Sequence, residues 1–352
     1  MTTPRADETR TTGENGMTSP SSRAVDFYFK CAVVVIGVVG TAANALVLYA
    51  MVASKQHRKH LLICNQNVFD LCSCLLLVVT YPLHLCNIRL TGTLGYWLCV
   101  VIFSDCLLWG TMNGSITNLA SVTVERYLRV VHPIWSKKRL RRWVIGAAAA
   151  YAWISGIVYQ LALVLSTTAV VDGVCYGRAF WSSRAAEVIH GVWNFVSFFV
   201  VVVLIFVVCY WRILAVIRRQ ASVMAGHRGP GPSSARIQSS QAQSNVIKTM
   251  IVVSAFYVVC WMPAFTYYLI FNLTTNIPFN ESGYYAVVFI CFFYICANPF
   301  IYAVKFDPVK CVLLSLIPCK MTAVPVASVN NMIEIHSSRP TTRVVWEHIS
   351  QV

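Results

Sequence analysis

The chain has 352 residues, of which 57% are hydrophobic and 12% are charged, and its formal net charge is +15. An ordinary soluble domain carries about 25% charged residues, so this composition excludes a soluble globular protein. The basic residues cluster in short segments between apolar runs, which is typical of membrane topology and argues against a nucleic-acid partner.

Seven apolar segments are long enough to cross a membrane as helices, so we predict an all-α membrane protein with a seven-transmembrane helix bundle. In chain order the predicted spans are 27–52, 61–86, 100–129, 143–166, 186–217, 246–271 and 284–304. Around them we predict a disordered extracellular tail over 1–25, a bundle over 26–305, a short amphipathic interfacial helix over 306–320, and a disordered cytoplasmic tail over 321–352.

The positive charges predict the orientation of the bundle. Basic residues directly follow the first span at 55–59 and the third span at 137–142, and such loops remain in the cytoplasm. The amino terminus is then expected outside a plasma membrane. Two glycosylation sequons, at Asn272 and Asn280, fall in a loop that this topology also places outside, so both are predicted acceptors.

The carboxyl-terminal third contains further signals. Four helix breakers at 229–232 predict a flexible cytoplasmic loop over 218–243. Asp307 followed by proline predicts the start of the interfacial helix, within or after which Cys311 and Cys319 are candidates for palmitoylation. The last residues end in Val352 and fit a peptide that a PDZ domain binds.

Three motifs occur in a fixed order along the spans. Glu125-Arg126-Tyr127 ends the third span, Cys260-Trp261-Met262-Pro263 lies in the sixth, and Asn298-Pro299 with Tyr302 lies in the seventh. An ionisable pair at a membrane boundary costs several kcal/mol, which favours a functional role. Together the motifs resemble those of the rhodopsin-like G-protein-coupled receptors, a family whose members bind ligands outside and activate heterotrimeric G proteins when the sixth helix moves outward.

The resemblance implies an activation set in the inner half of the bundle. These residues are Glu125, Arg126, Tyr127, Tyr210, Tyr257, Trp261, Pro263, Asn298, Pro299 and Tyr302. In the family an acid at the inner end of the sixth helix often pairs with the arginine, and this chain has Gln243 there. The missing ion pair predicts elevated basal activity. Membrane lipid and arrestin are further partners that the resemblance implies.

The resemblance also implies a polar core around a carboxylate at mid-membrane. Its members are Asn44, Asp70, Ser115 and Asn298, and they match the sodium site of the family in part. A sodium ion is therefore the candidate allosteric ion, and no other cofactor or metal is expected.

A disulfide between Cys99 and Cys175 is a further implication of the resemblance. Cys99 precedes Arg126 by twenty-seven residues, two more than the family usually has, so the third helix either begins late or contains a bulge. Asp105 then either lines the ligand pocket or is a solvated residue at its mouth. The aromatic candidates form a cage or pack as core. The candidate pocket residues are Asp105, Leu108, Phe265, Tyr268, Tyr284 and Phe292.

Two other classes of function remain for comparison. Polar residues at mid-membrane also mark secondary transporters, and a non-signalling seven-helix protein is a further alternative. An enzyme is not expected, because the sequence has no catalytic triad, phosphate-binding loop or metal-ligand cluster. For a receptor, the sequence leaves a peptide and a small amine-like molecule open as ligands.

Overall fold

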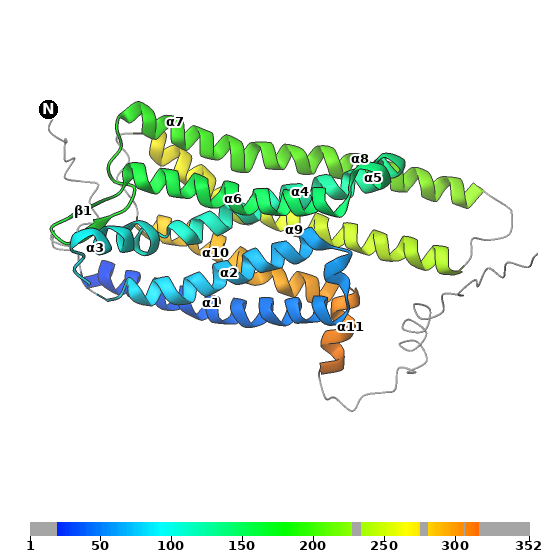
Figure 1. Cartoon of the computed structure of the whole chain (residues 1–352), viewed down its shortest axis with the longest axis horizontal. Coiled ribbons are helices and arrows are strands. Elements are labelled where there is room, and N and C mark those ends of the chain that lie inside the picture. Colours follow the sequence, from blue (N-terminus) through cyan, green and yellow to red (C-terminus); the bar gives the residue numbers. More distant parts are fainter. Residues whose placement is uncertain (1–19, 87, 227–233, 275–280, 306, 317–352) are drawn as a thin grey trace, which may run out of the picture. The chain divides into compact units, whose positions relative to one another are not determined.

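The chain folds into a bundle of long helices, seen in a computed structural model that describes residues 20–86, 88–226, 234–274, 281–305 and 307–316 (Figure 1). Seven of the described helical segments are long and apolar enough to cross a membrane. The predicted seven-span architecture is therefore confirmed. The described residues up to Leu314 belong to one compact unit.

The helices follow the predicted order, with the third and fifth spans each divided in two. Their bounds are α1 Pro20–Ala53, α2 Leu61–Leu83, α3 Gly92–Leu98, α4 Cys106–Val131, α5 Pro133–Arg139, α6 Arg142–Thr167, α7 Arg184–Phe195, α8 Val201–Gly226, α9 Ser234–Leu273, α10 Glu281–Lys305 and α11 Asp307–Leu316. Short π-helical segments, Cys99–Phe103 and Val196–Val200, follow α3 and α7.

Several helices are longer than the sequence predicted. The first begins at Pro20, inside the segment assigned to a disordered tail. Of the predicted flexible loop, 218–226 continues α8 and 234–243 already belongs to α9, so the prediction was wrong for both parts. Arg, Gln and Ala are good helix formers and extend a helix that an apolar span has already nucleated.

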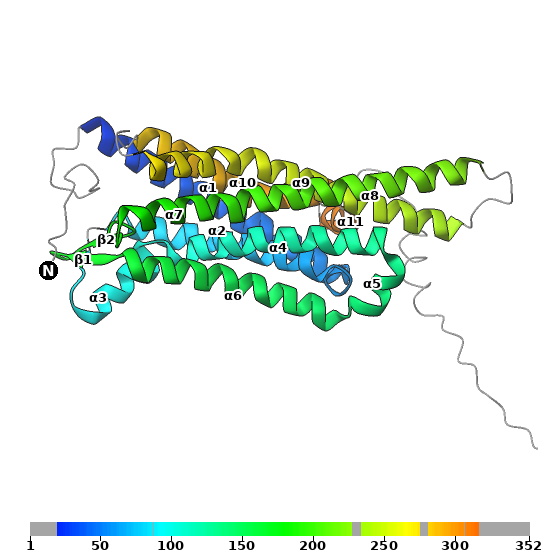
Figure 2. The same ribbon diagram turned by 90° about the horizontal axis from the view of Figure 1, so that it is seen from above.

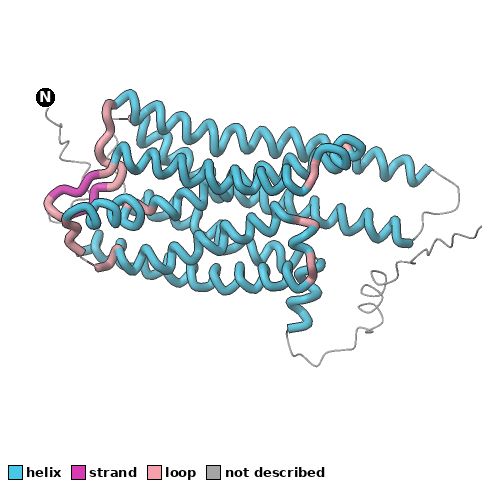
Figure 3. The backbone as a smooth tube through the Cα atoms, viewed as in Figure 1, coloured by secondary structure: helices cyan, strands magenta, loops and turns pink. Residues whose placement is uncertain are grey.

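A two-stranded antiparallel hairpin joins α6 to α7 and was not predicted (Figure 3). Its strands are β1 Ala169–Val171 and β2 Val174–Tyr176. The two residues between them, Asp172 and Gly173, have φ of 51° and 81°. Asp-Gly favours this two-residue turn, so the sequence did contain the signal.

The predicted disulfide between Cys99 and Cys175 is present and joins the third span to β2. The two additional residues before Arg126 are accommodated by the π-helical segment and a break in the helix. Ser104 donates its backbone N–H to the carbonyl of Cys99 at 2.9 Å, and Asp105 has a left-handed φ of 51°. Of the two predicted explanations, the structure therefore supports the local bulge.

Glycines permit an unusually close approach of α4 and α6, which run alongside each other (Figure 2). Gly110 and Gly114 lie four residues apart on α4 and face Gly156 on α6. A Cβ at Gly156 would lie 2.4 Å from the carbonyl oxygen of Gly110 and 2.8 Å from Cα of Gly114. Small residues at this spacing are a common basis of helix association in membranes.

Replacing Gly156 with alanine is expected to destabilise the bundle by about 1–3 kcal/mol, because neither backbone can yield to the added methyl group. Thermal unfolding of the purified full chain measures this as a lower midpoint. Gly146→Ala on the same helix is the matched control, because a Cβ there meets nothing within 4 Å. An equal loss of stability in the two variants would contradict the packing argument.

Candidate functional site

Arg126 lies at the end of α4 that adjoins α5, and it is buried with 8% of its surface exposed. Its Nη2 is 3.6 Å from a carboxylate oxygen of Glu125 and donates a 2.7 Å hydrogen bond to Nδ1 of His60. Arg129 binds the other oxygen of Glu125 more closely, at 2.8 Å. The predicted acid–arginine pair is therefore present, but the shorter contact of Arg126 is with a histidine.

His60 immediately precedes α2, outside the spans, and no motif in the sequence points to it. Burial, together with the cations of Arg126, Arg129 and Lys59, lowers the pKa of its imidazole to about 3. The ring is therefore neutral at physiological pH, and its unprotonated Nδ1 accepts a hydrogen bond from the guanidinium of Arg126. A hydrogen bond to a charged group is worth about 1.5–3 kcal/mol, so this contact restrains Arg126 substantially.

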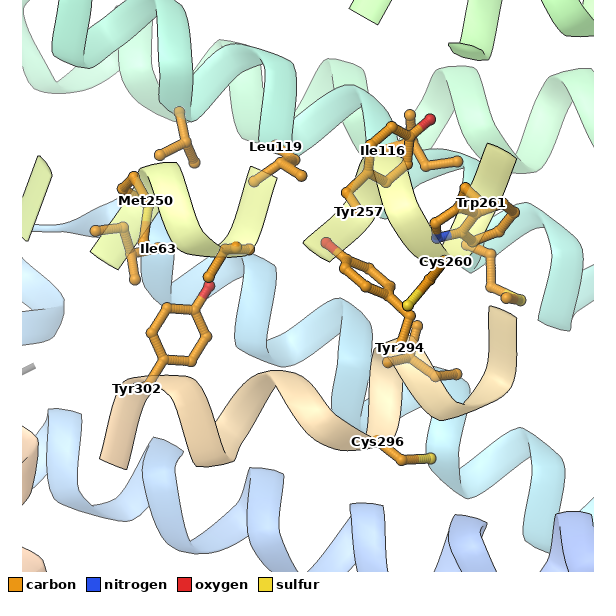
Figure 4. Packing of buried hydrophobic residues seen from close by; sticks show 14 of the residues in the cluster. Ile63, Ile116, Leu119, Met250, Tyr257, Cys260, Trp261, Tyr294, Cys296 and Tyr302 are labelled. Atoms are coloured by element: carbon orange, nitrogen blue, oxygen red, sulfur yellow. The ribbon is translucent and has the colours of Figure 1, made fainter. Parts of the chain in front are cut away.

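A chain of hydroxyl groups links three helices near Arg126. The Tyr210 hydroxyl on α8 lies 2.9 Å from Ser254 Oγ on α9 and 3.2 Å from Thr123 Oγ1 on α4. Tyr302 is buried separately on α10, where Figure 4 shows it beside Ile63 and Met250. Tyr127 contacts His132 rather than the arginine pair, through its hydroxyl at 3.3 Å.

The four predicted residues of the polar core lie together in the middle of the bundle. Ser115 Oγ donates to one carboxylate oxygen of Asp70 at 3.3 Å, and Asn298 Nδ2 donates to the other at 2.9 Å. Asn44 accepts from Asn67 at 2.8 Å and donates to the carbonyl of Ile295 at 3.4 Å. Pro299 follows Asn298 and lies within α10, where it removes one helical hydrogen bond.

Aromatic rings of α9 and α10 face one another in the hydrophobic core (Figure 4). Trp261 stands between Tyr257 and Phe265 on α9, with ring centroids 6.0 Å and 5.4 Å away. The Tyr257 hydroxyl donates to the carbonyl of Phe198, within the π-helical segment of the fifth span. Pro263 interrupts the hydrogen bonding of α9 next to this cluster.

The candidate pocket residues divide between core and a polar cluster at the disulfide end. Leu108, Phe265 and Phe292 are buried and belong to the main hydrophobic cluster. Tyr268 and Tyr284 are only partly buried. The Tyr268 hydroxyl lies 3.2 Å from Nδ1 of His190.

Asp105 is a constrained residue rather than a solvated one. Its carboxylate is 3.7 Å from Nε2 of His84, and its side chain is 16% exposed. Asp105 directly precedes α4, at the break in the third span, so the local backbone determines its position. The residue spacing of the family did not predict this break.

Arg178, between β2 and α7, extends toward the same cluster. Its guanidinium lies 5.7 Å from the ring centroid of Trp109 and hydrogen-bonds to Tyr284. The backbone of Arg178 has a left-handed φ of 59°, which is uncommon for a non-glycine residue. Sequence analysis missed this residue, since nothing in a loop sequence indicates which side chain turns inward.

The structure corrects one predicted modification site. Asn272 lies within α9 with 2% of its surface exposed, and its amide donates to the carbonyl of Tyr268 at 2.6 Å. A buried helical asparagine cannot serve as an acceptor for a glycan. Asn280, Cys319 and Val352 lie outside the described residues, whereas Cys311 is exposed on α11.

Comparison with known proteins gives one family. Residues 43–302 match the 7 transmembrane receptor (rhodopsin family). The somatostatin receptor type 5 of Bos taurus is 27% identical over 82% of the chain and 75% of the relative. The galanin receptor 2b of Danio rerio is 26% identical over 82% of the chain and 74% of the relative. The QRFP-like peptide receptor of Branchiostoma floridae is 23% identical over 87% of the chain and 80% of the relative.

Thr274→Ala is expected to leave the glycan mass of the chain unchanged. The substitution destroys the sequon and leaves the buried Asn272 in place, and it removes one exposed hydrogen bond, from Thr274 Oγ1 to the carbonyl of Ile270. Gel mobility before and after enzymatic deglycosylation provides the measurement, with Asn280→Gln as the comparison variant. A smaller mobility shift for Thr274→Ala than for the wild type would contradict the assignment of Asn272 as buried.

Proposed function

Because the chain belongs to the rhodopsin family of seven-transmembrane receptors, we propose that it binds an extracellular peptide and activates heterotrimeric G proteins through an outward movement of α9. As a member of this family it is a multi-pass plasma-membrane protein that signals and is not an enzyme. The family match argues against the transporter alternative.

We place the Arg126 end of the bundle in the cytoplasm and the amino terminus outside. Basic residues between the first and second spans and between the third and fourth support this orientation, because positively charged loops remain on the cytoplasmic side. The disulfide between Cys99 and Cys175 lies toward the opposite end, which suits an oxidising compartment.

The observation that carries the proposal is the set of contacts around Arg126. Glu125 is on the same helix and is shared with Arg129, while His60 comes from the segment before α2. Two hydrogen bonds link this part of α9 to its neighbours: Ser254 with Tyr210 on α8, and Thr249 with the carbonyl of Lys305 on α10. An outward movement of α9 would therefore break two neutral hydrogen bonds and open a cleft in which a G protein displaces Arg126 from His60 and binds it, with arrestin as a second cytoplasmic partner.

The ligand is proposed to be a peptide and not a small amine. The three relatives above are named as receptors for somatostatin, for galanin and for a QRFP-like peptide, which supports this class. Asp105, the acid nearest to the position of an amine anchor, is already close to His84. Arg178 instead offers a cation beside Trp109 and Tyr284, which suits an acidic or carboxylate-bearing peptide.

The polar core suits a sodium ion as an allosteric ligand. The carboxylate of Asp70, the hydroxyl of Ser115 and the amide of Asn298 are oxygen donors of the type that hard cations prefer. Asn298 Oδ1 is buried with no hydrogen-bond partner among the described residues, so it is available to such an ion. Palmitoylation of the exposed Cys311 and binding of a PDZ domain to Val352 complete the proposal.

A peptide agonist identified by second-messenger screening is expected to lose its signal with Arg126→Ala at equal surface expression. Arg178→Ala is expected to raise the half-maximal agonist concentration at least tenfold, because the cation that faces the ligand is removed. Arg184→Ala is the matched control, since its ion pair with Glu187 lies within α7. Equal effects of the two outer substitutions would contradict the role of Arg178, and signalling that survives in Arg126→Ala would contradict the coupling mechanism.

His60→Ala is expected to raise ligand-independent signalling severalfold. Loss of a hydrogen bond worth about 1.5–3 kcal/mol from the resting arrangement shifts the equilibrium toward the active one. Gln243→Glu, which introduces an acid on α9, is expected to lower ligand-independent signalling. Basal second-messenger levels at matched surface expression measure both, with Arg126→Ala as the silent reference. Unchanged basal signalling in His60→Ala would show that this contact does not restrain the resting state.

A further inference from the structure

A cavity of about 330 Å³ lies where α5 meets α6 and is lined by Lys138, Arg139, Arg141 and Trp143. Three of its four lining side chains are cations. The volume falls at the lower end of the range for small-molecule sites and suits a single polar headgroup. No residue of the receptor mechanism described above lines it.

The charges in this cavity lack acidic partners. The stretch from His132 to Trp143 contains no Asp or Glu, and Lys137 and Arg142 raise its cations to five. Among the described residues, none of these five cations is within an ion-pair distance of a carboxylate, whereas Arg126, Arg129 and Arg184 each have one. The cavity is therefore a site of uncompensated positive charge.

The start of α6 adds hydrogen-bond donors beside the same cations. Arg141 occupies the capping position in an extended conformation, and no side chain caps the helix. Val144 and Ile145 donate to the carbonyl of Arg141, so the first free backbone donors of this long helix are those of Arg142 and Trp143. Such donors, together with the positive end of the helix dipole, favour a bound anion.

The cavity lies at the start of a membrane-spanning helix that has an exposed apolar face. Trp143, Tyr151, Ile154 and Val158 are 58–69% exposed and lie on one face of α6 at spacings of eight, three and four residues. In a helix that spans a membrane, an exposed apolar stripe of this kind contacts acyl chains. Trp143 heads the stripe at the level where tryptophan prefers the lipid–water interface.

We propose that this cavity binds the phosphorylated headgroup of an anionic phospholipid, whose acyl chains lie along the exposed stripe of α6. The proposal rests on the orientation proposed above, which puts the cavity at the cytoplasmic leaflet. Clusters of four to eight basic residues at this leaflet typically bind phosphatidylserine or phosphoinositides. Three cations that line the cavity, with Lys137 and Arg142 next to them in the sequence, favour the multiply charged phosphoinositide over a singly charged lipid.

The test uses the purified full chain in phosphatidylcholine nanodiscs, to which phosphatidylinositol 4,5-bisphosphate or phosphatidylserine is added at equal mole fraction. Bound lipid is counted by native mass spectrometry after release from the disc. The triple variant Lys138→Gln, Arg139→Gln, Arg141→Gln is expected to bind the bisphosphate lipid at least tenfold more weakly than the wild type. Soluble inositol trisphosphate, which has the same phosphate chemistry without acyl chains, is expected to compete poorly.

The matched control removes three exposed arginines from α8 toward the same end of the bundle, as Arg212→Gln, Arg218→Gln, Arg219→Gln. It is expected to bind within about twofold of the wild type. Equal losses of lipid binding in the two variants would show that general surface charge causes the binding, and would overturn the proposal. Thermal unfolding without added lipid checks that both variants are folded.

Two other results would also overturn the proposal. Competition by soluble inositol trisphosphate at the same concentration as the lipid would make a free phosphate the occupant. Unchanged lipid binding in the cavity variant, with loss of G-protein coupling, would make the surface a protein-docking site. Because lipid binding is measured without signalling, it can succeed or fail independently of the proposed receptor function.

Discussion

A cation that is buried at the end of an apolar helix must be neutralised or hydrogen-bonded, and the contacts around Arg126 meet this requirement. Glu125 alone cannot do so, because Arg129 lies closer to it. A neutral imidazole supplies the remaining acceptor at no cost in charge. The resting arrangement therefore depends on a residue that follows the first span, a part of the chain that does not have to move when α9 does. Such a restraint holds the arginine while leaving α9 comparatively free.

The two sides of the bundle differ in how firmly their helices are joined. On one side, α4 and α6 meet through glycines at distances that admit no additional methyl group, so this pair moves as one body. On the other side, Tyr210 provides a single hydroxyl link between α8 and α9 near the arginine. Pro263 and the ring of Trp261 lie further along α9, where a change of packing can be converted into a tilt. In the proposed mechanism, the stiff side serves as the frame against which α9 moves.

The apolar runs predicted the spans well, because a helix that crosses a membrane admits few other residue types. The disulfide and the polar core were predicted from the resemblance to the receptor family. Asp70 requires hydrogen-bond donors at its own depth, and only a few helices can supply them. The contacts that escaped prediction are set by backbone detail. Asp105 is placed by a bulge, Arg178 by a left-handed turn, and His60 by the path of a short loop. The failed glycosylation site has a similar origin, since α9 continues through Asn272 where a loop was expected.

The outer and inner clusters are connected by continuous packing rather than by a chain of ion pairs. From Phe265 through Trp261 to Tyr257, each ring contacts the next, and Tyr294 on α10 touches the last two. Close-packed rings change position in discrete steps and not by gradual deformation. A ligand that contacts Phe265 and binds one packing arrangement of these rings more tightly than the other would shift the position of α9. Thermodynamic linkage makes this coupling reciprocal. If the ligand raises the affinity for a G protein that binds the released Arg126, the G protein raises the affinity for the ligand by the same factor.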